Sequence, residues 1–247
     1  GEHMENEVLL QVKGLSFTYG EEPVLKDVNL IIRRGERIAV MGSNGAGKST
    51  FFLNLNGVLR PDSGEILLCG SKIGKKELNL LRKKVGFVFQ DADSQIIAAN
   101  VWAEISFGPM NLGLERREVI RRVDAAVSYL GLEELQQRAP HYLSGGEKKQ
   151  VSIADILAME PELLIFDEPM AALDPMNAQR VEDILGKLHE DGKTLLVATH
   201  DVDFAWRFAD RILVFCDGML IEVEKIRENI YARRIWLFIC QVPAGAC

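Results

Sequence analysis

At 247 residues, the chain is long enough to form one large domain with a substantial hydrophobic core. Hydrophobic residues make up 47% of it and charged residues 26%, as in an ordinary soluble globular protein. The net charge of −7 argues against a nucleic-acid-binding protein, which would carry a basic face. None of the four cysteines forms a CxxC pair, so we expect a reducing compartment and no disulfide framework.

Two segments at the ends of the chain look foreign to a folded domain. Residues 1–3 resemble a cleavage scar, and residues 227–247 form a tail of doubtful origin. We therefore expect one domain over residues 4–226. No apolar run reaches the roughly 18 residues that cross a bilayer, so if this protein works at a membrane, something else must anchor it.

Short β-branched and aromatic runs predict strands in the first part of the chain. These runs are broken by glycine and charged turns, and they cover residues 8–12, 15–19 and 28–32. Residues 37–42 are continuously apolar, which is typical of a strand buried on both faces of a central sheet. A helix is then predicted from residue 48 to Gly57, followed by strands over 64–70 and 84–90.

The stretch from residue 92 to 159 has a different character, because strand signals are few and helical spacing dominates. We predict an inserted helical subdomain there, with apolar residues on one face of each of two helices. Those residues are Val119, Val123, Val127 and Leu130 in the first helix, and Val151, Ala154, Leu157 and Ala158 in the second.

From residue 163 onward, predicted strands and helices alternate. Apolar strand-like runs cover 163–167, 194–200 and 211–215, and helix-like runs cover 178–190 and 203–209. Alternation of this kind indicates a parallel sheet with crossover helices. The sequence therefore predicts an α/β fold.

The glycine-rich segment "GSNGAGKST" lies between the buried strand and the first helix. Gly42, Gly47, Lys48 and Ser49 satisfy the pattern G-x-x-x-x-G-K-[ST], a phosphate-binding loop. Glycine allows the backbone N–H groups to approach anionic oxygens, and the helix N-terminus adds positive potential. Lys48 would contact the β- and γ-phosphates, and Ser49 would ligate Mg²⁺. The predicted nucleotide contacts are Gly42, Ser43, Asn44, Gly45, Ala46, Gly47, Lys48, Ser49 and Thr50.

A second acidic element follows at "LLIFDE", where an apolar strand ends in two carboxylates. We expect Asp167 to hold Mg²⁺ through its water shell and Glu168 to polarise the attacking water. Phosphoryl transfer needs both functions, because the metal neutralises charge and the nucleophile must be oriented.

At "LSGGEKKQV" (residues 143–151) the sequence resembles the ATP-binding cassette (ABC) proteins, and the order of motifs agrees from residue 8 to about 222. The resemblance implies a P-loop NTPase core of the ABC ATPase type, with an N-terminal antiparallel β-subdomain and an inserted helical subdomain. It also implies that two such chains close ATP between them, head to tail.

The resemblance assigns further residues. Tyr19 would stack on adenine, Gln90 would touch Mg²⁺ and sense a membrane partner, and His200 would act at the γ-phosphate. Asp174 lies in the loop that crosses to the second subunit. The signature residues Ser144, Gly145, Gly146 and Glu147 would contact the ATP of the partner, where backbone amides at a helix N-terminus provide an anion site.

Residues 89–114 resemble, more narrowly, the ATPases of energy-coupling-factor and cobalt-uptake transporters. The matching positions are Asp93, Gln95, Phe107, Gly108, Pro109, Asn111, Gly113 and Leu114. This resemblance implies an importer subunit on the cytoplasmic face of the cell membrane, peripherally bound. A groove near residues 90–114 would accept a helix of a transmembrane subunit. The cargo would be cobalt, nickel or a vitamin, and the second ATPase would be identical or a paralogue.

Two positions depart from the family pattern. Met170 stands where threonine or serine is common, and Asp155 stands where the signature helix usually has a small residue.

Three other functions remain open: a chromosome-maintenance or clamp ATPase, a translation factor, and a regulatory module without turnover. The first would need long heptad segments and the second would carry two cassettes, whereas Lys48, Asp167, Glu168 and His200 argue against the third.

Overall fold

The computed structural model describes residues 7–93 and 95–223. The predicted scar at residues 1–3 and the tail at 227–247 lie outside these ranges. Within them, no helix combines the length and the apolar character that crossing a membrane requires.

The described residues form ten strands, seven α-helices and two short 3-10 turns. The strands are β1 (Val8–Tyr19), β2 (Glu22–Arg33), β3 (Arg37–Gly42), β4 (Ser63–Leu68), β5 (Ser71–Lys72), β6 (Val85–Val88), β7 (Leu163–Asp167), β8 (Thr194–Ala198), β9 (Arg211–Cys216) and β10 (Met219–Val223). The helices are α1 (Lys48–Leu55), α2 (Leu78–Lys84), α3 (Val101–Asn111), α4 (Arg116–Leu130), α5 (Gly145–Leu157), α6 (Pro175–Glu190) and α7 (Val202–Phe208), and the 3-10 turns are Glu133–Leu135 and Pro140–Tyr142.

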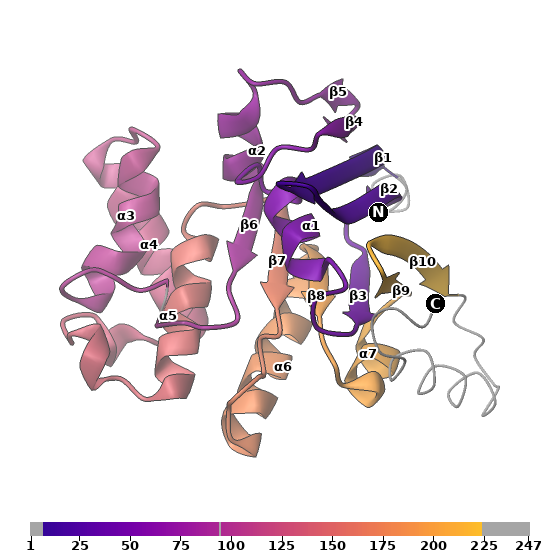
Figure 1. Ribbon diagram of the computed structural model, residues 1–247. Helices are drawn as coiled ribbons and strands as arrows, with labels where there is room; N and C mark the ends of the chain where they lie inside the picture. The colour runs from indigo at the N-terminus through magenta and orange to yellow at the C-terminus, as the bar shows by residue number, and fades with distance from the viewer. Residues whose placement is uncertain (1–6, 94, 224–247) are drawn as a thin grey trace.

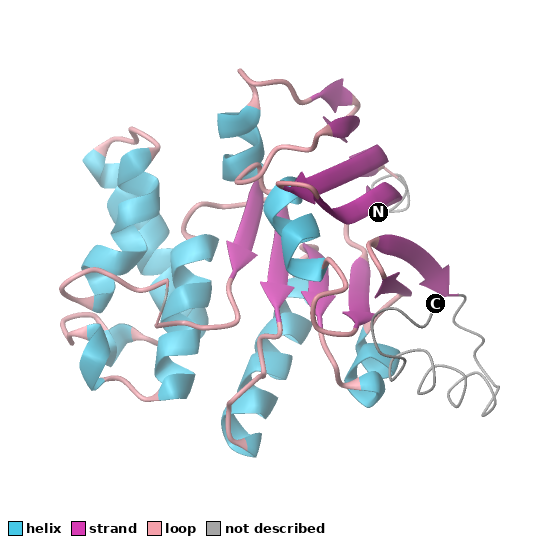
Figure 2. Ribbon diagram, in the orientation of Figure 1, coloured by secondary structure: helices cyan, strands magenta, loops and turns pink. Residues whose placement is uncertain are grey.

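The strands build two sheets (Figures 1 and 2). One is antiparallel, with the order β2-β1-β4-β5. The other has the order β10-β9-β3-β8-β7-β6 and is parallel except for β10. The helix α1 packs in the core between the two sheets. The predicted α/β fold with an N-terminal antiparallel β-subdomain is confirmed.

The central strands are buried on both faces, as their continuous apolar sequences predict. In β7, Leu163 and Ile165 pack into the core shared with the antiparallel sheet. Leu164 and Phe166 point to the opposite face, where they join the core under α5, α6 and α7. This period-two alternation places one strand between two cores and fixes its register.

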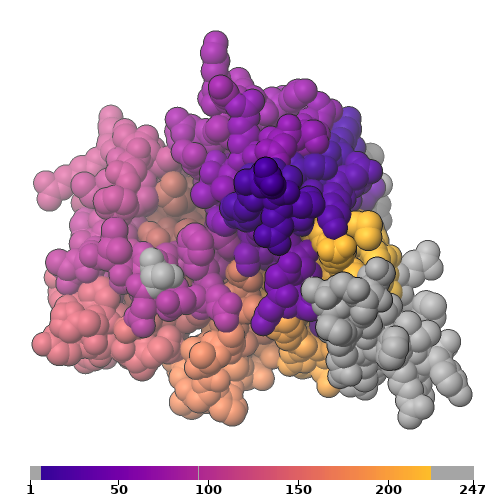
Figure 3. Space-filling model, in the orientation of Figure 1, coloured from indigo at the N-terminus to yellow at the C-terminus, as the bar shows by residue number. Residues whose placement is uncertain are grey.

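The helices α3, α4 and α5 pack against one another. They stand at the side of the main sheet next to β6, and in the space-filling view they form one flank of the molecule (Figures 1 and 3). The predicted apolar faces are buried at Val119, Val123, Val127 and Leu130, and at Val151, Ala154 and Ala158; Leu157 is half-buried.

Some predicted boundaries were wrong. Residues 8–12 and 15–19 are one strand, because Gly14 adopts a φ of 59° and β1 pairs with β2 on either side of an irregularity. The first helix ends at Leu55, before Gly57, which follows in a turn with a φ of 75°. The elements α2, α3 and β10 were not predicted individually; two of them are short, and α3 contains Pro109.

Candidate functional site

The loop between β3 and α1 depends on glycine at two positions. Gly42 has a φ of 142°, and a Cβ atom there would overlap the backbone carbonyl of Phe215 on β9. Gly47 has a φ of 110°, and its Cβ would lie 3.0 Å from the Leu25 side chain and 3.1 Å from the Val24 carbonyl oxygen. Side chains are excluded there by backbone conformation and by close packing, which explains the glycines of the motif.

Lys48 is the first residue of α1 and is only 7% exposed. Its Nζ donates a hydrogen bond to the carbonyl oxygen of Gly42 at the other end of the loop. A buried ammonium is costly unless it is hydrogen-bonded, so this contact fixes the charge at the floor of the loop. The loop and its lysine therefore form a compact positive site for anionic oxygens.

Two acidic residues, Asp167 at the end of β7 and Glu168 directly after it, face this loop. The hydroxyl of Ser49 donates a hydrogen bond of 2.9 Å to Asp167 Oδ2 at the end of β7. The next residue, Glu168, has a φ of 48°, unusual for a residue other than glycine, and its N–H donates to the Ala198 carbonyl oxygen at 3.0 Å. Strained backbone of this kind concentrates at functional sites.

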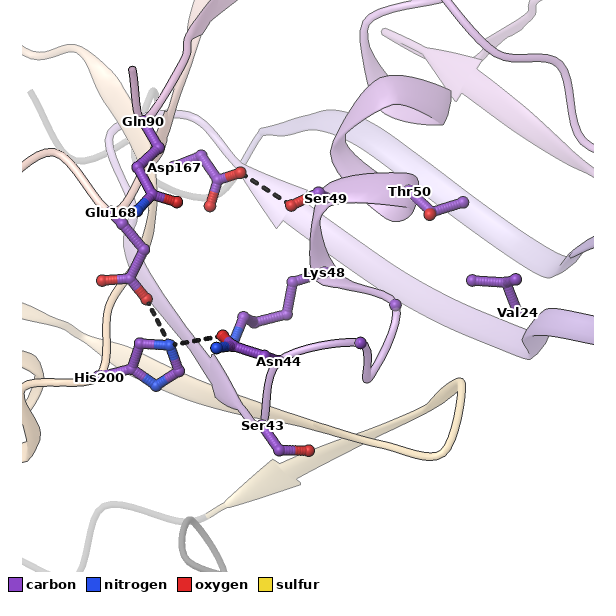
Figure 4. Close-up of a pocket in the computed structure, with 12 residues that line it drawn as sticks. Val24, Ser43, Asn44, Lys48, Ser49, Thr50, Gln90, Asp167, Glu168 and His200 are labelled. Atoms are coloured by element: carbon purple, nitrogen blue, oxygen red, sulfur yellow. Dashed lines mark hydrogen bonds and ion pairs between the residues drawn. The ribbon is translucent and has the colours of Figure 1, made fainter. Parts of the chain in front are cut away.

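Glu168 and His200 meet across the mouth of the loop (Figure 4). His200 Nε2 lies 3.1 Å from Glu168 Oε1 and 3.2 Å from Asn44 Oδ1. Burial raises the pKa of the Glu168 carboxyl, although the charges of His200 and Lys48 oppose the rise. A carboxyl and an imidazole in contact can hold and orient a water or a terminal phosphate.

These groups surround one cavity of about 310 Å³ (Figure 4). The cavity brings together the loop, the acidic strand end, the glutamine and the histidine that the sequence singled out. Its lining is Val24, Ser43, Asn44, Gly45, Gly47, Lys48, Ser49, Thr50, Gln90, Asp167, Glu168 and His200. Val24 was missed, because only the pairing of β2 and the packing of α1 bring that side chain to the loop.

Other predicted site residues lie away from this cavity. Tyr19 is 51% exposed and stacks edge-on against Phe17 instead of lining the cavity. Ser144 caps α5: its Oγ accepts from the Glu147 N–H at 3.2 Å, and Glu147 Oε2 accepts from the Ser144 N–H at 2.8 Å. Asp174 caps α6 with its side chain alone: its Oδ1 accepts from the N–H groups of Met176 and Asn177, each at 3.0 Å.

The signature helix is closely fitted to α6. A Cβ atom on Gly146 would overlap the side chain of Asn177, which itself donates to Asp174 Oδ2 at 2.5 Å. Gly146 is buried, whereas Ser144 and Gly145 are exposed at the surface. The helix N-terminus is therefore presented outward and lies outside the cavity of its own chain.

The segment predicted to form a partner groove carries several exposed apolar side chains. Ile97 is 78% exposed, Phe107 is 56% exposed and Met110 is 59% exposed. Pro109 is buried, so on α3 the exposed apolar surface comes from Phe107 and Met110. The Gln95 side chain contacts α5, because its Nε2 donates a hydrogen bond to the Ser152 carbonyl oxygen at 3.2 Å.

The unusual Asp155 lies on α5 beside this segment. Its Oδ2 accepts a long hydrogen bond of 3.5 Å from Gln95 Nε2. Burial, and then the negative charge of Glu104 on α3, raise the pKa of Asp155 to about 7, although the Gln95 contact opposes this rise. Glu104 is itself buried and accepts hydrogen bonds from the N–H groups of Ile97 and Ala98, at 2.9 and 2.6 Å.

The glycine loop, the acidic strand end and the histidine define a P-loop ATPase. Comparison with known proteins gives the family: the sequence profile described as "ABC transporter" matches residues 25–171. The chain belongs to this family of ABC ATPases. It binds ATP, and the activity of the family is ATP hydrolysis coupled to transport.

Three relatives illustrate the similarity. The energy-coupling factor transporter ATP-binding protein EcfA of Methanocaldococcus jannaschii is 45% identical over 217 residues, which cover 87% of this chain and 78% of that protein. The structure of cbiO1 from Clostridium perfringens, part of the ABC transporter complex cbiONQ, superposes with a TM-score of 0.79 at 41% identity, covering 87% of this chain and 88% of the other. The dimeric structure of a post-hydrolysis state of the ATP-binding cassette MJ0796, bound to ADP and phosphate, superposes with a TM-score of 0.77 at 32% identity. The match covers 90% of this chain and 100% of the other.

The position of Asp155 predicts a pH-dependent stability. Its folded pKa of about 7 exceeds the ordinary value of 3.8, so its contribution to stability is complete below pH 3.8 and is lost as the pH rises through 7. Asp155→Asn cannot ionise, and at pH 8 it should have a higher free energy of unfolding than wild type, by on the order of a few kcal/mol. Urea denaturation at pH 8 and pH 5 measures this difference, which should shrink at pH 5.

The matched control is Asp124→Asn, which changes an exposed aspartate on α4. Its effect on the free energy of unfolding should be small at both pH values. If Asp155→Asn changes stability equally at pH 5 and pH 8, the assignment of a raised pKa to Asp155 is wrong.

Proposed function

We propose that the chain is the ATP-hydrolysing subunit of a membrane importer of the energy-coupling-factor type. The observation that carries the ATP-hydrolysing role is the cavity in which Lys48, Ser49, Asp167, Glu168 and His200 converge. The 45% identity to an EcfA protein and the similarity to cbiO1 support the importer class. The cargo would be a metal ion such as cobalt or nickel, or a vitamin.

The loop residues Gly42 to Thr50 would bind the phosphates of ATP through backbone N–H groups, the positive end of α1 and the Lys48 ammonium. Ser49 and Asp167 supply hard oxygen donors 2.9 Å apart, and the Gln90 amide lines the same cavity. The described residues contain no cluster of three His, Cys, Asp or Glu side chains that could hold a metal alone. This donor set fits Mg²⁺, which takes few protein ligands and completes its shell with phosphate oxygens and water.

In hydrolysis, bound Mg²⁺ would neutralise charge on the phosphates. Glu168 would orient the attacking water and take its proton, and His200, 3.1 Å from Glu168, would contact the terminal phosphate. The buried surroundings of Glu168 increase its affinity for a proton, as general-base chemistry near neutral pH requires.

We further propose a head-to-tail dimer. Ser144, Gly145, Gly146 and Glu147 lie outside the cavity of their own chain but present a capped helix N-terminus at the surface. An ATP held in the loop of one chain would then meet the Ser144 end of α5 from another chain. Asp174 would lie at the same junction, and Tyr19 would reach the adenine from the rim. The dimeric state described for MJ0796 supports this arrangement.

The second partner would be an integral membrane subunit. Ile97, Phe107 and Met110 expose apolar surface within residues 90–114, which suits an amphipathic helix laid along α3. The chain would then be held peripherally at the cytoplasmic face of the membrane through that subunit.

Replacing the proposed base tests the chemistry and the dimer together. Glu168→Gln keeps the shape and one oxygen of the side chain but removes its charge, so hydrolysis should fall about a hundredfold or more. ATP should still bind, because Lys48, Ser49 and the loop amides are unchanged. With Mg²⁺ and ATP the variant should accumulate as a dimer, which light scattering after size exclusion measures.

The control for this variant is Glu190→Gln, at the exposed end of α6, which should hydrolyse ATP as wild type does and form no lasting dimer. Wild-type turnover by Glu168→Gln would exclude the proposed base. A variant that is inactive and binds ATP but remains monomeric at saturating ATP would contradict the head-to-tail dimer.

Introducing charge on α3 tests the membrane partner. Phe107→Glu should abolish co-purification with the co-expressed transmembrane subunit, because a carboxylate would be buried against an apolar helix face. ATP affinity, measured by calorimetry, should not change. The matched control is Ile221→Glu, since Ile221 is 48% exposed on β10, at the other edge of the main sheet from β6. Equal co-purification by the Phe107→Glu variant and wild type would refute this docking site.

A further inference from the structure

Lys149 is a buried lysine that none of the preceding assignments uses. It lies in the second turn of α5 and is 2% exposed. Its Nζ donates hydrogen bonds to two consecutive backbone carbonyl oxygens, that of Phe89 at 2.9 Å and that of Gln90 at 2.7 Å. Phe89 and Gln90 are the first residues after β6, and the Gln90 side chain lines the phosphate cavity.

Two neighbouring contacts fasten the rest of this segment to the same helix. Lys148 Nζ lies 2.5 Å from Asp93 Oδ1, and Gln95 Nε2 donates to the Ser152 carbonyl oxygen at 3.2 Å. Lys149 is the fully buried member of the three and the one that holds the residue beside the cavity. The position of Gln90 therefore depends on α5 through Lys149.

The chemistry of this contact requires an amine. An apolar side chain of similar length would fill the same space, but it would leave the two carbonyl oxygens without this donor. A buried ammonium costs free energy unless it is hydrogen-bonded, and here both contacts are charge-assisted. Burial lowers the pKa of Lys149 to about 8, and the negative charges of Asp91 and Asp167 oppose this effect.

We propose that Lys149 is a positioning residue for ATP hydrolysis, which holds the Gln90 backbone so that the Gln90 side chain meets the nucleotide site. This inference rests on the proposed role of Gln90. The same helix begins at Ser144, where the ATP of the partner chain would bind, so Lys149 connects the two nucleotide sites of a dimer. If ATP bound at one site of the dimer displaced α5, that displacement would move Gln90 at the other nucleotide site.

The test replaces the amine while keeping the length of the side chain. For Lys149→Met in the full chain at pH 7, kcat should fall about ten- to a hundredfold, the penalty of small misplacements at a reacting centre. KM for ATP should stay within about twofold, because the loop contacts are intact. Lys149→Arg can still donate to both carbonyls and should restore most of kcat. The matched control is Lys83→Met, which removes an exposed lysine on α2 and should leave kcat equal to that of wild type.

A double-mutant cycle separates this inference from the role of Gln90. If Lys149 acts through Gln90, adding Lys149→Met to Gln90→Ala should cause little further loss of kcat. If the losses of kcat caused by Lys149→Met and Gln90→Ala multiply in the double variant, the inference is wrong. It is also wrong if Lys149→Met raises KM but leaves kcat unchanged, or if Lys149→Arg is as impaired as Lys149→Met. If Gln90→Ala alone retains full kcat, the proposed role of Gln90 fails first. If the methionine variant does not fold, Lys149→Gln gives the same readouts, because its amide is uncharged and its nitrogen is one atom closer to the backbone than Nζ. An unchanged kcat for Lys149→Gln would overturn the inference.

Discussion

The hydrogen bond from the Lys48 ammonium to the Gly42 carbonyl closes the loop on which the rest of the site depends. It ties the start of α1 to the end of β3, so the loop between them has a fixed shape before any phosphate binds. Both ends of the loop require glycine, because the β9 backbone crowds Gly42 and the β2 chain crowds Gly47. A preorganised cradle of this kind avoids the cost of ordering the loop on binding.

The order of strands then explains why the other groups arrive at the same place. In the main sheet β3, β8, β7 and β6 are neighbours and parallel, so their carboxyl ends share one edge. Gly42 is the last residue of β3 and Asp167 is the last residue of β7. His200 lies two residues after β8, and Gln90 lies two residues after β6. Ligands of open parallel sheets bind at this edge. The helical segment adds α5, whose Lys149 holds the glutamine and whose N-terminus faces outward.

The sequence predicted the parts of the site that depend on local chemistry. A glycine loop between a buried strand and a helix, and a strand ending in Asp167 and Glu168, are short-range patterns with one physical interpretation. Contacts made by folding were not predictable in this way. Val24 lines the cavity only through the pairing of β2, and Lys149 read as one more polar residue on a helix. The single strand β1 was missed because the irregularity at Gly14 looks like a turn.

On this view of the site, the Lys48 loop is where ATP binds. Calorimetric titration of ATP and Mg²⁺ into wild type and Lys48→Ala tests it most directly. Loss of charge-assisted hydrogen bonds worth about 1.5–3 kcal/mol each should weaken ATP binding by at least about tenfold. An affinity of Lys48→Ala equal to that of wild type, with the variant folded, would contradict the account.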